Sequence, residues 1–189
     1  MEKDEAYQRL IEGNARYAAG KPRQAAVTAA LRNDLYTNGQ FPYAAIVACS
    51  DSRVPVELIF DAGPGELFVI RTAGNIVGLF EMGSLEFAVG QLKTLLVVVL
   101  GHDKCGAVRA AVDGGDFSPA IEAIMKEIRS GIKSVACGDS YEIYEDENIQ
   151  YTLSKIAANP CISKASSDNL VRLVAAKYSL ETGTVTFFN

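Results

Sequence analysis

Several features that would assign this 189-residue chain to a class are absent from its sequence. The wholly apolar runs, such as residues 95–100, are far too short to span a bilayer and are typical of buried strands. The N-terminus has no uninterrupted apolar segment, so we expect no signal peptide and a cytoplasmic protein. The net charge of −5 argues against non-specific nucleic-acid binding. We therefore expect neither a membrane nor a nucleic acid among its partners.

Histidine, tryptophan and cysteine are also scarce. Tryptophan is missing, and His102 is the only histidine. The four cysteines are Cys49, Cys105, Cys137 and Cys161. In a chain of this size without a secretion signal, cysteines more often bind a metal or catalyse a reaction than form a disulfide framework.

The order of apolar and amphipathic segments predicts a single α/β domain, which we assign to residues 1–189. Wholly apolar runs alternate with amphipathic segments, as in a mainly parallel sheet covered by helices on both faces. Residues 1–38 would form an N-terminal helical arm, because two helical patterns precede the first apolar run. We expect helices at 4–19, 28–37, 82–93 and 119–131, and strands at 43–48, 67–70, 95–100, 170–176 and 184–188.

Polar, chemistry-bearing residues follow two of these predicted strands. The first strand runs into Cys49, Asp51 and Arg53, and the third runs into His102 and Cys105. Ligand sites in parallel sheets collect at the carboxyl ends of strands. If the two strands are neighbours, Cys49, His102 and Cys105 can converge.

Two thiolates and one imidazole suit Zn²⁺, and three protein ligands leave a fourth position for water, as in catalytic sites. Because two thiolates cancel the charge of the ion, bound water should be less acidic than at three neutral histidines, and activity should rise toward alkaline pH. Arg53 can hold the Asp51 carboxylate ionised and oriented, and the Gly106 N–H is free to face a ligand.

Two alternatives remain open from these residues alone. The cluster could be a structural zinc site that takes Cys137 or Cys161 as its fourth ligand, in a non-catalytic binding protein. A redox role for the cysteines is disfavoured, because the sequence has no Cys-x-x-Cys motif.

Sequence motifs along nearly the whole chain resemble those of the β-carbonic anhydrases. Segment 48–55 (Ala-Cys-Ser-Asp-Ser-Arg-Val-Pro) is similar to the first signature of the family, and 101–107 (Gly-His-Asp-Lys-Cys-Gly-Ala) is similar to the second. Segments 65–71, 73–76, 83–89 and 178–183 fit the family in order and spacing.

The resemblance implies reversible hydration of carbon dioxide to bicarbonate and a proton. One Zn²⁺ per chain would be held by Cys49, His102 and Cys105. The zinc-bound hydroxide would be oriented by the catalytic dyad of Asp51 and Arg53. The resemblance also implies residues that position the substrate or form an apolar wall, namely Gln40, Gly106, Phe68 and Phe87.

The resemblance further implies a homodimer or larger homo-oligomer. The missing tryptophan and Gln40 favour the open subtype, in which water rather than Asp51 takes the fourth zinc position. Phe87 and Thr72 depart from residues common in the family, which affects pocket shape rather than metal ligation. A related zinc hydrolase acting on carbonyl sulfide or carbon disulfide would share these ligands. With its only histidine committed to zinc, the protein is expected to pass protons through waters, Asp51 or a tyrosine to external buffer.

Overall fold

The computed structural model describes residues 1–23, 27–133 and 140–188. Its centre is a five-stranded sheet of order β2-β1-β3-β4-β5. Four strands are parallel, and β5 pairs antiparallel with β4. The strands are β1 (Ala44–Cys49), β2 (Leu67–Thr72), β3 (Leu96–His102), β4 (Arg172–Tyr178) and β5 (Val185–Phe188). The predicted class, a mainly parallel α/β sheet flanked by helices, is confirmed.

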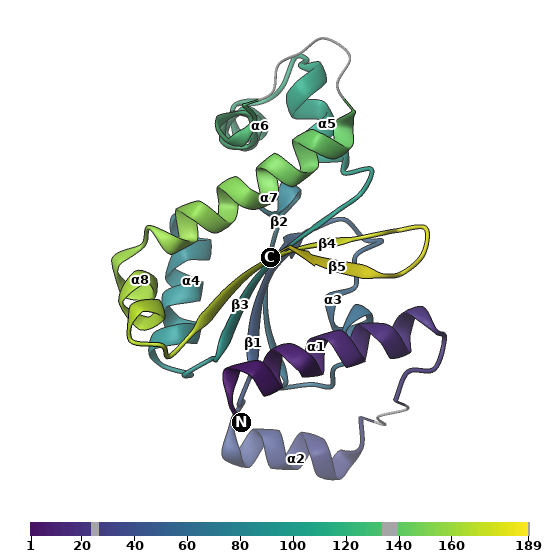
Figure 1. Cartoon of the computed structure of the whole chain (residues 1–189), viewed down its shortest axis with the longest axis vertical. Helices are drawn as coiled ribbons and strands as arrows, with labels where there is room; N and C mark the ends of the chain where they lie inside the picture. The colour runs from purple at the N-terminus through teal and green to yellow at the C-terminus, as the bar shows by residue number, and fades with distance from the viewer. Residues whose placement is uncertain (24–26, 134–139, 189) are drawn as a thin grey trace.

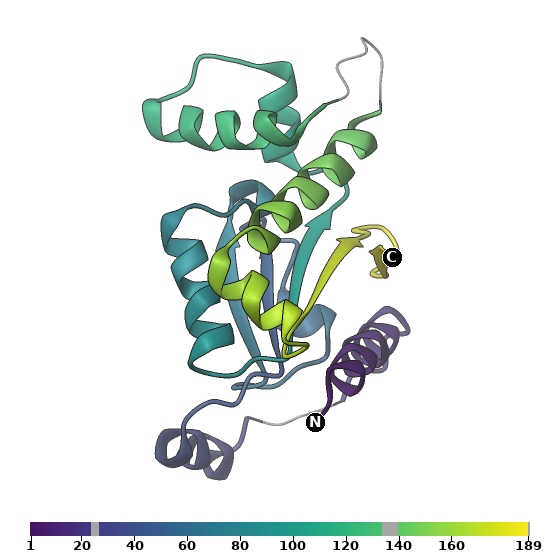
Figure 2. The ribbon, with the colours of Figure 1, turned by 60° about the vertical axis from the view of Figure 1, so that its left-hand side comes forward.

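Helices cover both faces of this sheet (Figures 1 and 2). One face packs on α1 (Lys3–Ala18) and α3 (Val56–Ile59), and the other on α4 (Leu79–Gly90), α7 (Tyr141–Ala157) and α8 (Pro160–Ser167). Side chains alternate along each strand, so Ile46 and Val98 enter the first core while Val47 and Val99 enter the second. Strands β1 and β3 are buried throughout, which explains their continuous apolar sequence.

A third apolar cluster lies beyond the carboxyl ends of the strands. It is formed largely by α5 (Gly106–Asp113), α6 (Pro119–Gly131) and part of α7, and it includes Cys49 and Cys105. Figure 1 shows α7 passing between these helices and the sheet. Helix α7 therefore contacts both the end of the sheet and the helices beyond it.

The N-terminal helices differ in how they pack. Helix α1 buries Ala6, Leu10 and Gly13 against the protein's own sheet and α3. Helix α2 (Ala29–Asn38) begins at Thr28, whose hydroxyl caps the Leu31 amide, and it buries none of its residues. The arm thus consists of one packed helix and one exposed helix.

The predicted strands and helices lie within a few residues of observed elements, but four α-helices were omitted. Strand β3 continues through His102, which places the histidine on the strand rather than after it. The predicted helix at 82–93 is α4, which begins three residues earlier and exposes Leu79 and Phe80. Helices α3, α5, α7 and α8 were not predicted. Among the described residues, no helix combines the length and apolarity needed to cross a membrane.

We predict that Gly13→Ala destabilises the fold, because α1 approaches α3 closely at this point. A Cβ on Gly13 would lie 2.0 Å from the carbonyl oxygen of Phe60, a backbone atom that cannot turn away. The free energy of unfolding in urea should fall by about 1–3 kcal/mol. The control is Gly90→Ala in α4, where a Cβ meets nothing within 4 Å. Equal losses in the two variants would contradict the close packing of α1.

Candidate metal centre

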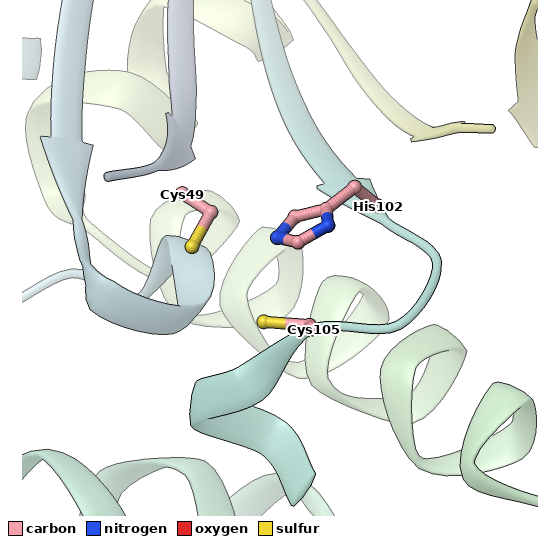
Figure 3. Close-up of side chains that lie close together, drawn as sticks. All are labelled: Cys49, His102 and Cys105. Carbon is pink, nitrogen blue, oxygen red and sulfur yellow. The ribbon is translucent and has the colours of Figure 1, made fainter. Parts of the chain in front are cut away.

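Three potential metal ligands converge at the carboxyl edge of the sheet. Cys49 ends β1, His102 ends the neighbouring strand β3, and Cys105 is the N-cap residue of α5. Their ligand atoms lie within 4.8 Å of one another, and all three residues are buried. Figure 3 shows their side chains pointing toward a common centre. The predicted convergence of these residues is confirmed.

The turn between β3 and α5 brings Cys105 back toward the strand ends. Lys104 adopts a left-handed conformation with φ of 51°. The Asp103 carboxylate accepts hydrogen bonds from the Leu180 amide at 2.9 Å and the Ser179 hydroxyl at 3.2 Å. The turn is therefore attached to the β4–β5 connection on one side.

The hydrogen bonds of His102 suit it to bind a cation. Its Nδ1 lies 2.8 Å from the carbonyl oxygen of Asp103, which accepts the Nδ1 proton. In the neutral ring the Nε2 atom then carries the lone pair, and it is buried without a hydrogen-bond partner among the described residues. A cation at the centre of the cluster would satisfy this atom.

The two thiols also fit a cation. A hydrogen bond from the Cys105 thiol lowers the pKa of Cys49, and the same contact together with burial raises the pKa of Cys105. Two buried sulfurs this close cannot both ionise at neutral pH unless a positive charge compensates them. Zn²⁺ would do so, because it binds thiolates and draws off their protons.

Asp51 and Arg53 lie beside the cluster. Arg53 donates from Nε to Oδ1 of Asp51 at 2.9 Å and from Nη2 to Oδ2 at 2.7 Å, a bidentate pair. These bonds hold the pKa of Asp51 well below its usual range. Oδ2 of Asp51 is 4.0 Å from Nε2 of His102. The carboxylate is thus ionised and adjacent to the metal ligands.

Arg71 is a site residue that the sequence interpretation did not assign. It ends the apolar part of β2, and its guanidinium donates to the carbonyl of Cys49 at 2.8 Å and to that of Asp51 at 2.6 Å. It therefore fixes the backbone on both sides of Ser50. A charged residue directly after the apolar run 67–70 was the available signal.

The predicted substrate residues are divided between the two ends of β1. Gly106 is the first residue of α5, next to Cys105, where helix amides have no intrahelical acceptor. Gln40 precedes the start of β1, and that start lies about 16 Å from Cys49 at 3.3 Å per residue. Phe68 pairs with Ala45 near the same start, and its ring contacts that of Phe87. Within one chain, these three residues lie away from the metal ligands.

The site thus combines a Cys-His-Cys cluster that could hold a metal with an Arg–carboxylate pair, at the carboxyl edge of a parallel sheet. The family model for carbonic anhydrase matches residues 44–185 of this chain. The chain therefore belongs to the carbonic anhydrase family, and its similarity to solved structures identifies it as a β-class member.

Two curated relatives match over almost their whole length. Carbonic anhydrase 2 of Mycobacterium tuberculosis is 35% identical, with 94% of this chain and 89% of that protein covered. The carbonic anhydrase of Mycolicibacterium smegmatis is 33% identical, with 95% and 90% covered.

Solved structures agree in fold. The β-carbonic anhydrase CcaA is 28% identical with a TM-score of 0.75, and 97% of this chain and 95% of that chain are covered. A tetrameric β-carbonic anhydrase of Sordaria macrospora has the same TM-score at 21% identity, with 98% of both chains covered.

We predict that metal binding depends on Cys49 and Cys105 and not on Cys161, because Cys161 is an exposed residue of α8 outside the cluster. Purified protein should bind about one Zn²⁺ per chain. Cys49→Ser and Cys105→Ser should lose most of it, and Cys161→Ser should retain it, as measured by elemental analysis.

Cys137, the other candidate for a fourth ligand, lies outside the described residues. If Cys137→Ser strips the metal, the site has four protein ligands and the structural-zinc alternative gains support. Full retention of zinc in this variant supports an open fourth position.

Proposed function

We propose that this protein catalyses the reversible hydration of carbon dioxide to bicarbonate and a proton at a Zn²⁺ held by Cys49, His102 and Cys105. The observation that carries the proposal is the three-ligand cluster with the ionised Asp51 carboxylate beside it. When bound, Zn²⁺ would supply Lewis-acid chemistry that lowers the pKa of a coordinated water. Membership of the family supports the same activity.

Asp51 would orient the attacking oxygen. Held by Arg53, its carboxylate can only accept a hydrogen bond, so it directs a proton of the nucleophile toward itself and a lone pair toward carbon dioxide. Arg53 also donates from Nη2 to the carbonyl of Lys104 at 3.3 Å, which connects the dyad to the loop of Cys105. The amide of Gly106 would bind an oxygen of the substrate.

The open subtype is part of the proposal. Asp51 is engaged by Arg53 through both oxygens and lies outside the three-residue cluster of potential ligands. This arrangement supports a fourth position taken by water. Because His102 is needed as a ligand, protons would leave through water, Asp51 or a tyrosine to external buffer.

Gln40, Phe68 and Phe87 would act on the site of a second copy of the chain. They lie toward the end of β1 opposite the ligands, so they can complete a site only when another subunit brings them to it. Phe87 is 49% exposed, and Leu79 and Phe80 on the same helix are each 83% exposed. This apolar surface of α4 supports a homodimer or a larger homo-oligomer.

We predict that Asp51→Ala lowers the rate of hydration by roughly 100-fold or more, because the variant loses the group that orients the nucleophile. Stopped-flow assays of zinc-replete protein measure this rate. The matched control is Asp113→Ala, which removes a carboxylate paired with Arg109 at 3.2 Å outside the cluster. Activity retained by Asp51→Ala would contradict the assigned role.

The same assay tests the related hydrolase. If zinc-loaded wild-type protein does not hydrate carbon dioxide but releases sulfide from carbonyl sulfide, the hydrolase is favoured.

We predict that activity rises with pH across about pH 6.5–9 and that Asp51 is not the group responsible. Its pKa is lowered by Arg53, so the carboxylate is already ionised throughout this window and loses its charge only in acid. The rise should therefore persist in Asp51→Asn at a lower rate. A profile that becomes flat in this variant would contradict the assignment.

We predict that two inactive variants restore activity when they assemble together. Cys49→Ser has a broken metal site and an intact Gln40, and Gln40→Leu has the reverse. In a mixed dimer one site combines the intact ligands with the intact glutamine, so random mixing should recover about one quarter of wild-type activity. The variants should be unfolded and refolded together, with separately refolded samples as the control. No recovery in confirmed mixed dimers would contradict a glutamine supplied by the partner.

A further inference from the structure

Helix α7 carries a line of buried polar side chains toward the end of the sheet. Glu145 is 4% exposed, Asn148 is fully buried and Thr152 is 1% exposed. Their spacing of three and four residues places them on one face of the helix. Burying a carboxylate and an amide is costly unless specific partners compensate them. The partner of Glu145 is the Cys105 loop, and the partner of Asn148 is the turn at Gly74, which contacts the thiol of Cys49.

Glu145 holds the backbone of one ligand. Its Oε1 accepts a hydrogen bond from the amide of Cys105 at 3.1 Å, and its Oε2 is 2.9 Å from Nζ of Lys177 on β4. Lys177 also binds Asp146 at 2.8 Å. Although burial opposes the charge of Lys177, its hydrogen bonds to Asp146 and Glu145 raise its pKa, so Lys177 is charged. Glu145 thus joins the N-cap residue of α5 to the sheet.

Asn148 holds the turn that contacts the other thiol. Its Nδ2 donates to the carbonyl of Gly74 at 2.8 Å, in the short helix η1 (Ala73–Asn75). The amide of Gly74 in turn donates to Sγ of Cys49 at 3.3 Å. Gly74 has φ of 76°, and a Cβ there would lie 2.7 Å from Cδ1 of Ile128. The orientation of this amide therefore depends on the turn that Asn148 fixes.

We propose that Glu145 and Asn148 are positioning residues of the metal centre, which together hold the Cys105 loop and the Gly74 turn on one helix and so set the separation and hydrogen bonding of the two thiolates. The inference rests on the metal site of the proposed function. It assigns a role to α7, which provides none of the three ligands. Residues that hold metal ligands in this way contribute about 10–100-fold to metal affinity.

The test measures metal affinity and the spectrum of the bound metal rather than catalytic activity. Co²⁺ replaces Zn²⁺ in thiolate sites and gives a sulfur-to-cobalt charge-transfer band that reports the geometry and donor strength of the sulfurs. Zinc affinity is measured separately by competition with a chromophoric chelator. The variants are Glu145→Leu, which removes the hydrogen bond to the Cys105 amide, and Asn148→Leu, which removes the hydrogen bond to the Gly74 carbonyl. Each should weaken zinc binding by about 10–100-fold and change the cobalt band.

Two further variants separate positioning from charge and stability. Glu145→Gln keeps an oxygen for the Cys105 amide and should restore most of the affinity and the wild-type spectrum. Asp146→Asn changes a neighbouring partner of Lys177 that contacts neither ligand loop, so it should leave both unchanged. If Glu145→Leu fails to fold, Glu145→Leu/Lys177→Met removes both charges and still leaves the Cys105 amide without its acceptor.

The outcomes distinguish this inference from the proposed function. Wild-type affinity and an unchanged cobalt band in both leucine variants would overturn the positioning role while leaving the metal site in place. A loss in Asp146→Asn as large as that in Glu145→Leu would also overturn it, since the effect would then follow from charge at Lys177. A wild-type protein that shows no thiolate–cobalt band would instead refute the metal centre itself.

Discussion

The site depends on the pairing of two neighbouring parallel strands, β1 and β3. In both, the apolar sequence gives way to polar residues at the carboxyl end of the strand. Strands β1 and β3 are apolar because both faces of the sheet are covered, and each ends in a buried candidate metal ligand, Cys49 or His102. Their register places Ala48 opposite Leu100, so Cys49 is level with Gly101 and His102 follows one residue beyond it on the neighbouring strand. Only Cys105 then requires a special conformation, the left-handed Lys104 in a three-residue turn.

Helix α7 fixes the parts of the site that lie beyond the ends of the strands. Strand ends are fixed by the sheet, but the Gly74 turn and the Cys105 loop extend beyond it. Both are attached by hydrogen bonds to consecutive turns of one buried helix. Arg71 and Arg53 do the same from the solvent side, binding the carbonyls of Cys49 and Lys104. The ligand loops are thus held by side chains on both sides of the cluster.

The convergence of the three candidate ligands and the pairing of Asp51 with Arg53 could be predicted from sequence because these residues follow the apolar runs of two strands. The strands were predicted from the same apolar runs. Helix α7 was missed because its inward face carries Glu145, Asn148 and Thr152, which weakens the amphipathic pattern on which helix prediction depends. Its polar face contacts groups more than 30 residues away, and no local pattern encodes those contacts. The placement of Gln40 at the far end of β1, by contrast, follows from its position before that strand in the sequence.

Charge pairing accounts for how so many ionic groups occupy one partly buried region. Asp51 is neutralised by Arg53 and Glu145 by Lys177, and the two thiolates would be neutralised by a divalent cation. Because each carboxylate is paired with a cation, it adds little net charge near the cluster. Its effect comes from the hydrogen bonds that its oxygens accept. If Zn²⁺ binds there, the two thiolates would cancel its charge. A water on the metal would then be less acidic than at a site with neutral ligands. Under the proposed function, orientation of the nucleophile by Asp51 would add to the acidification that a zinc ion supplies, so displacement of the bidentate contact between Arg53 and Asp51 should be poorly tolerated.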